Sequence, residues 1–449
     1  MLSVDLEPAI QAIGTQIHDA LPRPSRNPVK VVDARAMEMA SRDEELRSAL
    51  FRLVDVTPAC RSTADLARHL AAYLEEVPER SPALDAALRA AHSPGGARAL
   101  GRATAVGVRH MAHRFIAGET PKKALGEFQR LWEAGVASSV DLLGEATVTT
   151  AEADHYAARC RDALDTVAPA AARWPAREAL ERDSLGGSAR ANVSVKISAL
   201  TPHMRPEAPQ VGREDAGARL RPLLRRAKEL GAYLHIDMES VNSLETTFEL
   251  IFGILAEPEF RDGPETGLVL QAYLRESPLQ LEQVLEFARG AGRSTPLTIR
   301  LVKGAYWDHE LVEAQQHGWS VPVFEVKAES DRNFESLTRA LIEARAAGDP
   351  VRVAVASHNM RSVAHAIACN RSLGGTDQDL ELQVLRGLGD ELQHALSANG
   401  LRVRAYCPVG DLVAGMAYLV RRLLENTSND SFLGDQQRGV PIRELLAAP

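Results

Sequence analysis

The chain is poor in the features that mark secreted, zinc-bound, membrane-spanning and nucleic-acid-binding proteins. Its four cysteines are scattered without CxxC spacing, which indicates neither a disulfide framework nor a zinc site. It opens without the basic and apolar regions of a signal peptide and contains no apolar run of about 18 residues. A net charge of −8 argues against nucleic acid as a partner. We therefore expect a cytoplasmic protein without a bound metal, at most peripherally associated with the inner membrane.

The predicted secondary structure divides the chain into two parts. A hydrophobic content of 45% and a charged content of 25% are typical of a globular protein, and 449 residues exceed one ordinary domain. Residues 1–128 show no strand pattern, and amphipathic helices are predicted over Ser62–Glu76 and Pro82–Ala91. The next helix carries a basic face over residues 98–114, compatible with anionic lipid or a partner and also with plain solvation. We expect an all-helical N-terminal arm over 1–128 and a second domain over 129–449.

Short β-rich runs alternate with helical segments through the second part. The predicted strands are Val140–Leu143, Val193–Ser198, Tyr233–Met238, Leu268–Tyr273, Leu297–Val302, Val351–Ala356, Leu380–Leu385 and Val403–Tyr406. Helices such as Ala151–Thr166, Ala216–Leu230 and Leu244–Leu255 separate them. Strand–helix alternation indicates parallel pairing, and eight such units predict an α/β fold, a closed (β/α)8 TIM-like barrel.

The predicted strands end on polar groups, and in such a barrel the chemistry lies where strands end. These ends carry Glu145, Lys196, Asp237 with Glu239, Gln271, Arg300 with Lys303, His358, Arg386 and Tyr406. Such a rim indicates a ligand with many polar atoms and both charge signs. Lys196 is either paired with an acid such as Glu145 or Asp237, or held against an electron-rich ligand. The turn Gly387-Leu388-Gly389 is predicted to offer free amides to a phosphate.

The stretch Tyr418–Asn426 is the most informative, because it places two adjacent arginines in an apolar helix. Tyr418 precedes Arg421 and Arg422 by three and four residues, so the three side chains can lean toward one point. Paired guanidinium groups form a carboxylate clamp. Taken alone, the same stretch also fits a solvated basic helix face.

The strand ends, taken together, resemble the proline dehydrogenase family, especially the proline dehydrogenase domain of bacterial bifunctional proline utilisation A flavoenzymes. The matching motifs, in the order of the family, are Leu143-Gly144-Glu145-Ala146, Val195-Lys196-Ile197-Ser198, His235-Ile236-Asp237-Met238-Glu239, Arg300 through Trp307, Ser357-His358-Asn359, Tyr406 through Gly410 and Tyr418 through Asn426. The resemblance implies a distorted barrel with FAD across the carboxyl ends of the strands. It implies no Rossmann domain, which agrees with the absence of G-x-G-x-x-G.

The resemblance also implies a role for each matching residue. In the substrate site, Arg421 and Arg422 would clamp the proline carboxylate, Lys196 would be a third cation and Glu145 would pair with the clamp. Tyr406 and Tyr418 would wall the ring pocket, Asp237 would lie beside it, and Ala305 and Leu385 would pack on the substrate. The implied catalytic residues are Lys196, Asp237, Tyr406, Arg421 and Arg422. The implied FAD-binding residues are Gln271, Arg300, Val302, Lys303, Gly304, Ala305, Tyr306, Trp307, His358 and Glu425.

The activity implied is FAD-dependent oxidation of L-proline to 1-pyrroline-5-carboxylate by hydride transfer to flavin N5. Electrons would pass to a membrane quinone, in the first step of proline catabolism to glutamate. Bifunctional relatives continue into an aldehyde dehydrogenase, whereas this chain stops at Pro449. Three alternatives stay open: a separate gene product, a piece of a longer enzyme, or a pathway in which a separate 1-pyrroline-5-carboxylate (glutamate semialdehyde) dehydrogenase is the partner. One alternative is another FAD-dependent barrel oxidoreductase, acting on a different cyclic amino acid or similar to methylenetetrahydrofolate reductase. The other is a proline-responsive binding or regulatory protein.

Overall fold

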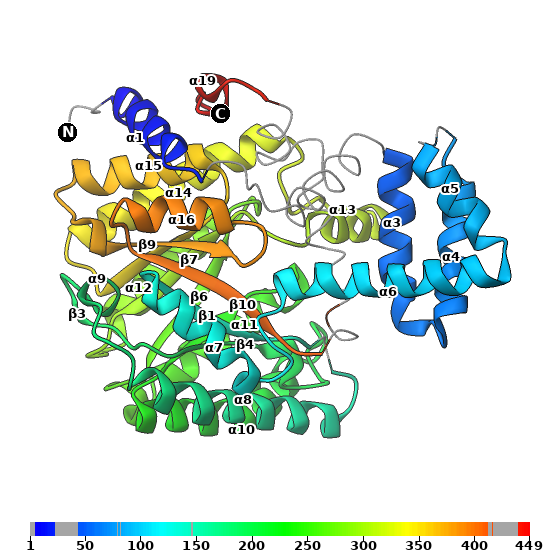
Figure 1. Ribbon diagram of the computed structural model, residues 1–449. Coiled ribbons are helices and arrows are strands. Elements are labelled where there is room, and N and C mark those ends of the chain that lie inside the picture. Colours follow the sequence, from blue (N-terminus) through cyan, green and yellow to red (C-terminus); the bar gives the residue numbers. More distant parts are fainter. Residues whose placement is uncertain are drawn as a thin grey trace.

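The chain folds around a closed barrel of eight parallel strands, which confirms the predicted fold class (Figure 1). The structure is a computed structural model that describes residues 5–22, 44–78, 80, 82–144, 147–411, 415 and 439–449. The strands follow the order β1-β10-β9-β8-β7-β6-β5-β4, and β4 closes the ring on β1. They are β1 (Val136–Leu142), β4 (Asn192–Lys196), β5 (Tyr233–Asp237), β6 (Glu265–Gln271), β7 (Leu297–Val302), β8 (Val351–Ala356), β9 (Leu380–Leu385) and β10 (Val403–Val409).

Helices form the outer layer around these strands (Figure 1). They are α7 (Pro121–Glu133), α8 (Thr150–Ala171), α10 (Pro209–Leu230), α11 (Val241–Leu255), α12 (Ser277–Gly290), α13 (Trp307–His317), α14 (Lys327–Ala346), α15 (Met360–Ser372) and α16 (Asp390–Ala398). Local sequence sets their ends. Thr149 and Glu152 form a capping box that begins α8, and Gly231, at φ +59°, ends α10. Apolar side chains of strands and helices bury one another in a continuous core between the layers.

A separate helical unit stands to one side of the barrel and includes α3 (Glu44–Val56), α4 (Thr63–Glu75), α5 (Pro82–Ala91) and α6 (Pro94–Phe115). Its small core gathers leucines of α3 and α4, among them Leu46, Leu53, Leu66, Leu70 and Leu74. The long helix α6 runs from this unit to the barrel (Figure 1). Just beyond α6, the amide of Ala117 donates to the carbonyl oxygen of Pro408 in β10 at 2.8 Å. The helical region thus meets the barrel at the carboxyl end of a strand, while the proposed division at residue 128 stays a prediction.

The first described helix, α1 (Glu7–Asp19), packs on the barrel helix α15 rather than on the arm. Arg361 of α15 is buried and holds this contact together. Its Nη1 donates to both carboxylate oxygens of Glu7, at 2.6 and 2.7 Å, and to the carbonyl oxygen of Leu446 at 2.9 Å. Its Nε donates to Glu335 of α14 at 2.8 Å. One guanidinium therefore fastens segments from both ends of the chain to the barrel.

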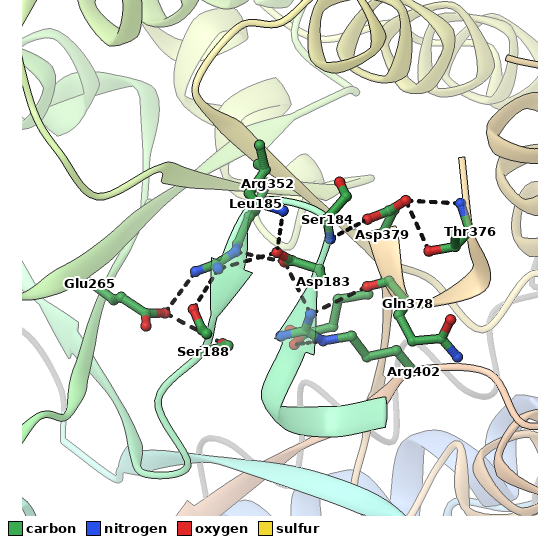
Figure 2. Close-up of polar contacts among 12 residues, drawn as sticks. Asp183, Ser184, Leu185, Ser188, Glu265, Arg352, Thr376, Gln378, Asp379 and Arg402 are labelled. Carbon is green, nitrogen blue, oxygen red and sulfur yellow. Dashed lines mark hydrogen bonds and ion pairs between the residues drawn. The ribbon is translucent and has the colours of Figure 1, made fainter. Parts of the chain in front are cut away.

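The amino ends of the strands are closed by a charged hairpin, β2 (Arg182–Asp183) and β3 (Gly186–Gly187), shown in Figure 2. Asp183 accepts hydrogen bonds from Arg352 Nε at 2.7 Å and from Arg402 Nη1 at 3.2 Å. Arg352 also donates to Glu265 at 2.9 Å. Because Arg352, Glu265 and Arg402 lie at or near the amino ends of β8, β6 and β10, the hairpin forms a floor beneath the barrel. Buried ions are tolerated there because each is paired.

Strand bounds differ most from the predictions where polar residues enter the barrel. β1 begins at Val136, four residues before the predicted start, because Ser138 and Ser139 belong to it and are buried. A prediction based on apolar runs therefore misses the first half of β1. The floor hairpin and α1 were not predicted either. Both are short segments fixed by contacts with distant residues.

Candidate functional site

Asp237, the last residue of β5, is the hub of a charged cluster at the carboxyl ends of the strands. Its Oδ1 accepts from Arg300 Nη1 at 2.8 Å and from Ser194 Oγ at 2.7 Å. Its Oδ2 accepts from the Tyr406 hydroxyl at 2.6 Å and lies 3.5 Å from Lys196 Nζ. Three other strands thus place side chains around one carboxylate of β5, and Lys196 is paired with Asp237, which was one of the two alternatives for this lysine.

The electrostatics of this cluster keep its charges fixed. Burial alone would raise the pKa of Asp237, but the Lys196 ammonium and the Arg300 guanidinium outweigh it and lower the pKa to about 2. Burial acts to lower the pKa of Lys196, yet Asp141 and Asp237 raise it well above its usual value. Burial, with Asp141 and Asp237 nearby, also raises the pKa of Tyr406. At neutral pH Asp237 is therefore ionised, Lys196 is charged and the Tyr406 phenol is neutral.

Asp141 is a member of the cluster that the sequence reasoning missed. It is buried in β1 and forms an ion pair with Lys196, and it stands in register with Ser194 of β4. We expected Glu145 to provide the acid of the first strand, but β1 ends at Leu142 and Glu145 lies outside the described residues. The available indication was that Asp141 is an acid inside a buried strand. A buried carboxylate needs a cation, so its position alone indicated an ion pair.

Two buried groups beside the hub have atoms without partners in the described part of the chain. Arg300 has a side chain only 4% exposed, and its Nε and Nη2 have no hydrogen-bond acceptor there. Its guanidinium lies 5.1 Å from the centre of the Tyr406 ring. Gln271 at the end of β6 donates from Nε2 to the carbonyl oxygen of Glu239 at 3.1 Å, while its Oε1 has no donor among the described residues. Buried polar atoms normally have partners, so these atoms at the strand ends are candidate contacts for a ligand.

The segment after β7 is shaped for close approach to the strand ends. Gly304 has φ +135°, and a Cβ there would lie 2.4 Å from the Tyr273 ring, so only glycine fits. Lys303 is ion-paired with Asp331, which also accepts from Lys327 at 2.7 Å. The assignment of Lys303 to cofactor binding stays a prediction, as do the assignments of Val302 and Ala305. Val302 is the last residue of β7, and Ala305 lies in the segment that follows it.

Three further predicted cofactor residues, Tyr306, Trp307 and His358, follow the carboxyl ends of β7 and β8. Trp307 begins α13, is 36% exposed, and donates from Nε1 to the carbonyl oxygen of Phe324 at 2.8 Å. Tyr306 precedes it and is partly buried. His358 Nε2 accepts from the amide of Leu385 at 2.9 Å, which joins the ends of β8 and β9. These positions share the mouth with the hub.

The predicted phosphate site at Gly387-Leu388-Gly389 is wrong. The amide of Gly387 donates to Asp390 Oδ1 at 2.9 Å, and those of Leu388 and Gly389 donate to the carbonyl oxygen of Leu385 at 3.3 and 2.9 Å. All three amides are therefore used within the turn. A G-x-G spacing does not show whether the amides are free. The predicted residues Tyr418, Arg421, Arg422 and Glu425 lie outside the described residues.

Comparison with known proteins gives the family. The proline dehydrogenase family model matches residues 124–435, which span the barrel. The chain belongs to the proline dehydrogenase family. A second model, the proline utilization A N-terminal domain, matches residues 7–115, so the helical region before the barrel also follows this family.

Individual members of the family are similar over most of this chain. The bifunctional protein PutA of Salmonella typhimurium is 33% identical over 355 residues, which cover 76% of this chain and 25% of that protein. Proline dehydrogenase 1 of Bacillus subtilis is 25% identical over 74% of this chain and 92% of its own length. The chain thus spans about a quarter of the bifunctional relatives that it matches.

A solved structure of the family has the same fold. Proline utilization A of Bdellovibrio bacteriovorus, inactivated by N-propargylglycine, matches with a TM-score of 0.89 and 34% identity over 99% of this chain and 44% of that one. Among the described residues of the present structure, no helix is long and apolar enough to cross a bilayer.

Proposed function

We propose that this chain is an FAD-dependent proline dehydrogenase that oxidises L-proline to 1-pyrroline-5-carboxylate. The observation that carries the proposal is the Asp237 hub, where Lys196, Arg300 and Tyr406 converge on one carboxylate in a barrel of the proline dehydrogenase family. These residues belong to the strand-end motifs from which the activity was first expected.

The described residues fit the cofactor. Arg300 Nε and Nη2 are buried donors, and Gln271 Oε1 is a buried acceptor, all without partners in the described chain. A flavin ring, which carries carbonyl acceptors and one N–H donor along its edge, would satisfy them. FAD, when bound there, would supply a hydride acceptor for the substrate carbon next to the amine.

The hub residues would position and balance charge rather than transfer protons. Asp237 stays ionised at neutral pH, because its pKa is lowered to about 2, so it orients Arg300 and Tyr406 as an acceptor. Asp141 and Asp237 offset Lys196 and Arg300, which leaves the described cluster without excess charge. We therefore assign recognition of the proline carboxylate chiefly to Arg421 and Arg422, with Lys196 as a third cation. Fixed charges of this kind cost no reorganisation during the reaction.

The experiment that tests this function is anaerobic reduction of the bound flavin across a panel of cyclic amino acids. We expect purified protein to carry flavin and L-proline to bleach its absorption. Bleaching by another cyclic amino acid but not by proline would favour the alternative barrel oxidoreductase. Proline binding without flavin would favour a regulatory protein, and would overturn the proposal.

We propose a membrane quinone as the electron acceptor and a 1-pyrroline-5-carboxylate (glutamate semialdehyde) dehydrogenase as the enzyme that uses the product. Together these steps would carry proline to glutamate. The relatives named as bifunctional support the second step, whereas the quinone is proposed from the family resemblance alone. Quinone reduction by the holoenzyme, measured with proline as donor and a soluble quinone as acceptor, tests the first step.

A basic stripe on α6 supports peripheral association with an anionic membrane surface. Arg98, Arg102, Arg109 and Arg114 are exposed and make no ion pair within the described part of the chain, and α6 contains no acidic residue. The stripe also carries Val106, which is 68% exposed. By contrast, the arginines of α10 face acids, as Arg225 does with Glu259. Because α6 ends beside β10, a membrane held by this stripe would lie near the barrel mouth.

Vesicle flotation tests the association. Replacing Arg98, Arg102 and Arg109 by glutamine should release the protein from anionic vesicles, whereas neutral vesicles should bind neither form. A matched variant with glutamine at Arg161, Arg225 and Arg289, each paired with an acid, changes the net charge equally and should stay bound. Equal release of both variants would mean that net charge, rather than the α6 stripe, controls binding.

A further inference from the structure

Three side chains of the helical arm that favour metal ions converge outside the barrel. A thiol, a carboxylate and an imidazole, from Cys60, Asp65 and His69, place one possible ligand atom each within 4.8 Å of one another. The Asp65 carboxylate and the His69 Nε2 atom are 3.9 Å apart. All three residues are partly buried, so the cluster is reachable from solvent but shaped by its surroundings. It shares no residue with the barrel site.

The backbone holds these three residues in place through local hydrogen bonds. Ser62 caps α4 by accepting from the Asp65 amide at 3.1 Å, and Asp65 Oδ2 accepts from the Arg61 amide at 3.1 Å. Cys60 Sγ lies 3.5 Å from the carbonyl oxygen of Val56. His69 follows Asp65 by four residues on α4, so both project from one helical face. The site is therefore largely formed before any ion arrives.

The chemistry of the set selects a class of ion. Thiolate, imidazole and carboxylate together suit divalent transition metals of borderline softness, whereas calcium and magnesium prefer oxygen ligands alone. Ligand atoms around tetrahedral zinc lie roughly 3.3–3.8 Å apart, given bond lengths of about 2.0–2.3 Å. Small side-chain rotations, on the order of 1 Å, would bring the three atoms to that spacing.

We propose that Cys60, Asp65 and His69 bind a divalent transition metal, with Zn²⁺ as the expected ion and water as the fourth ligand. The spacing C-x4-D-x3-H is not a double-cysteine pattern, which is why the cysteine spacing gave no indication of it. The main competitor is Arg68, which is ion-paired with Asp65. Its side chain is largely exposed, and such surface pairs contribute little, so an ion can displace it.

The cysteines of this chain permit a direct test on the full-length protein. Cys160, Cys369 and Cys407 are buried, while Cys60 is partly exposed, so a thiol-alkylating reagent should modify Cys60 first in the folded state. Stoichiometric Zn²⁺ should slow this alkylation at least about 10-fold, because the metal-bound sulfur is masked. With Co²⁺, the protein should show a near-ultraviolet thiolate-to-metal absorption band that Cys60→Ser removes.

Ligand variants distinguish this site from weak surface binding. His69→Ala and Asp65→Asn should each weaken Zn²⁺ protection at least about 10-fold, since even outer contacts of metal sites contribute factors of 10–100. His113→Ala, which removes an exposed histidine of α6 outside the cluster, should leave protection unchanged. Circular dichroism checks that each variant is folded. Absence of protection in the unmodified protein, or equal protection in His69→Ala, overturns the proposal.

Discussion

The Tyr406 hydroxyl donates to Asp237 across the mouth of the barrel, at 2.6 Å between the two oxygens. Tyr406 belongs to β10 and Asp237 to β5, and these strands are not neighbours in the barrel order. The Tyr406 ring also faces the Arg300 guanidinium, whose Nη1 donates to the same carboxylate at 2.8 Å. Tyr406 therefore has two separable properties, a hydroxyl that fixes the hub and a ring that occupies space.

The ring of Tyr406 should set substrate choice. A bulky side chain rejects added atoms by overlap, so we expect kcat/KM for L-proline to exceed that for trans-4-hydroxy-L-proline by at least about 10-fold. Tyr406→Ser should narrow this ratio, mainly by weakening proline binding. Tyr406→Phe keeps the ring but loses the hydrogen bond to Asp237, and it should retain the selectivity. Comparable kcat/KM for both substrates in the unmodified enzyme would rule out this role.

The two adjacent arginines should govern the affinity for proline. Arg421→Met and Arg422→Met should each raise the proline KM about 10- to 150-fold, because a charge-assisted hydrogen bond contributes about 1.5–3 kcal/mol. Flavin content should be retained in both variants. Arg443→Met, an exposed arginine of the C-terminal helix α19 (Ile442–Leu445), is the control and should leave KM unchanged. Unaltered proline kinetics in both clamp variants would remove these arginines from the site.

Asp237 should make the fold sensitive to acid. Its pKa is lowered from 3.8 to about 2 in the folded state, so its ionised form stabilises the fold above about pH 4. This contribution, on the order of 2 kcal/mol, is lost as the pH falls toward 2. Urea unfolding at pH 6 and pH 3 should show a smaller loss of unfolding free energy in Asp237→Asn than in the unmodified protein. Glu381, whose pKa is also lowered to about 2, would supply part of the remaining pH dependence.

An identical change of unfolding free energy between the two pH values in both proteins would contradict the assignment for Asp237. A variant at an exposed acid that makes no ion pair in the described structure, Glu391→Gln, serves as the control. It should show the pH dependence of the unmodified protein. This comparison separates the buried hub from the general charging of the surface in acid.

The floor hairpin should contribute to stability without taking part in the reaction. Asp183→Ala leaves the buried guanidinium groups of Arg352 and Arg402 without this partner, which typically costs about 3–5 kcal/mol of unfolding free energy. The midpoint of urea unfolding should fall accordingly. The kcat for proline, measured well below the unfolding temperature, should remain close to that of the unmodified enzyme. A large loss of kcat in folded Asp183→Ala would instead connect the floor to the mouth.

The barrel could be predicted from the sequence because buried parallel strands occur as short apolar runs between helical segments. The sequence left the partner of Lys196 open between Glu145, Asp237 and a ligand, and the structure pairs Lys196 with Asp237, which stands in register with it on the neighbouring strand. The sequence reasoning missed Asp141, since serines and an acid interrupt the apolar pattern of β1. Asp183 and Arg352 meet although 169 residues separate them, and no local pattern records such a contact.

The closed floor limits the routes by which ligands can enter and leave the barrel. In the described part of the chain, the charged side chains of the floor line a cavity of about 20 Å³, enough for a water molecule but not for a metabolite. Entry and exit must then share the opposite mouth. Under the proposed function, the amino acid, its oxidised product and the electron acceptor would all pass through this one opening of the barrel. These three molecules would bind there one at a time, so an excess of any one of them would inhibit binding of the others.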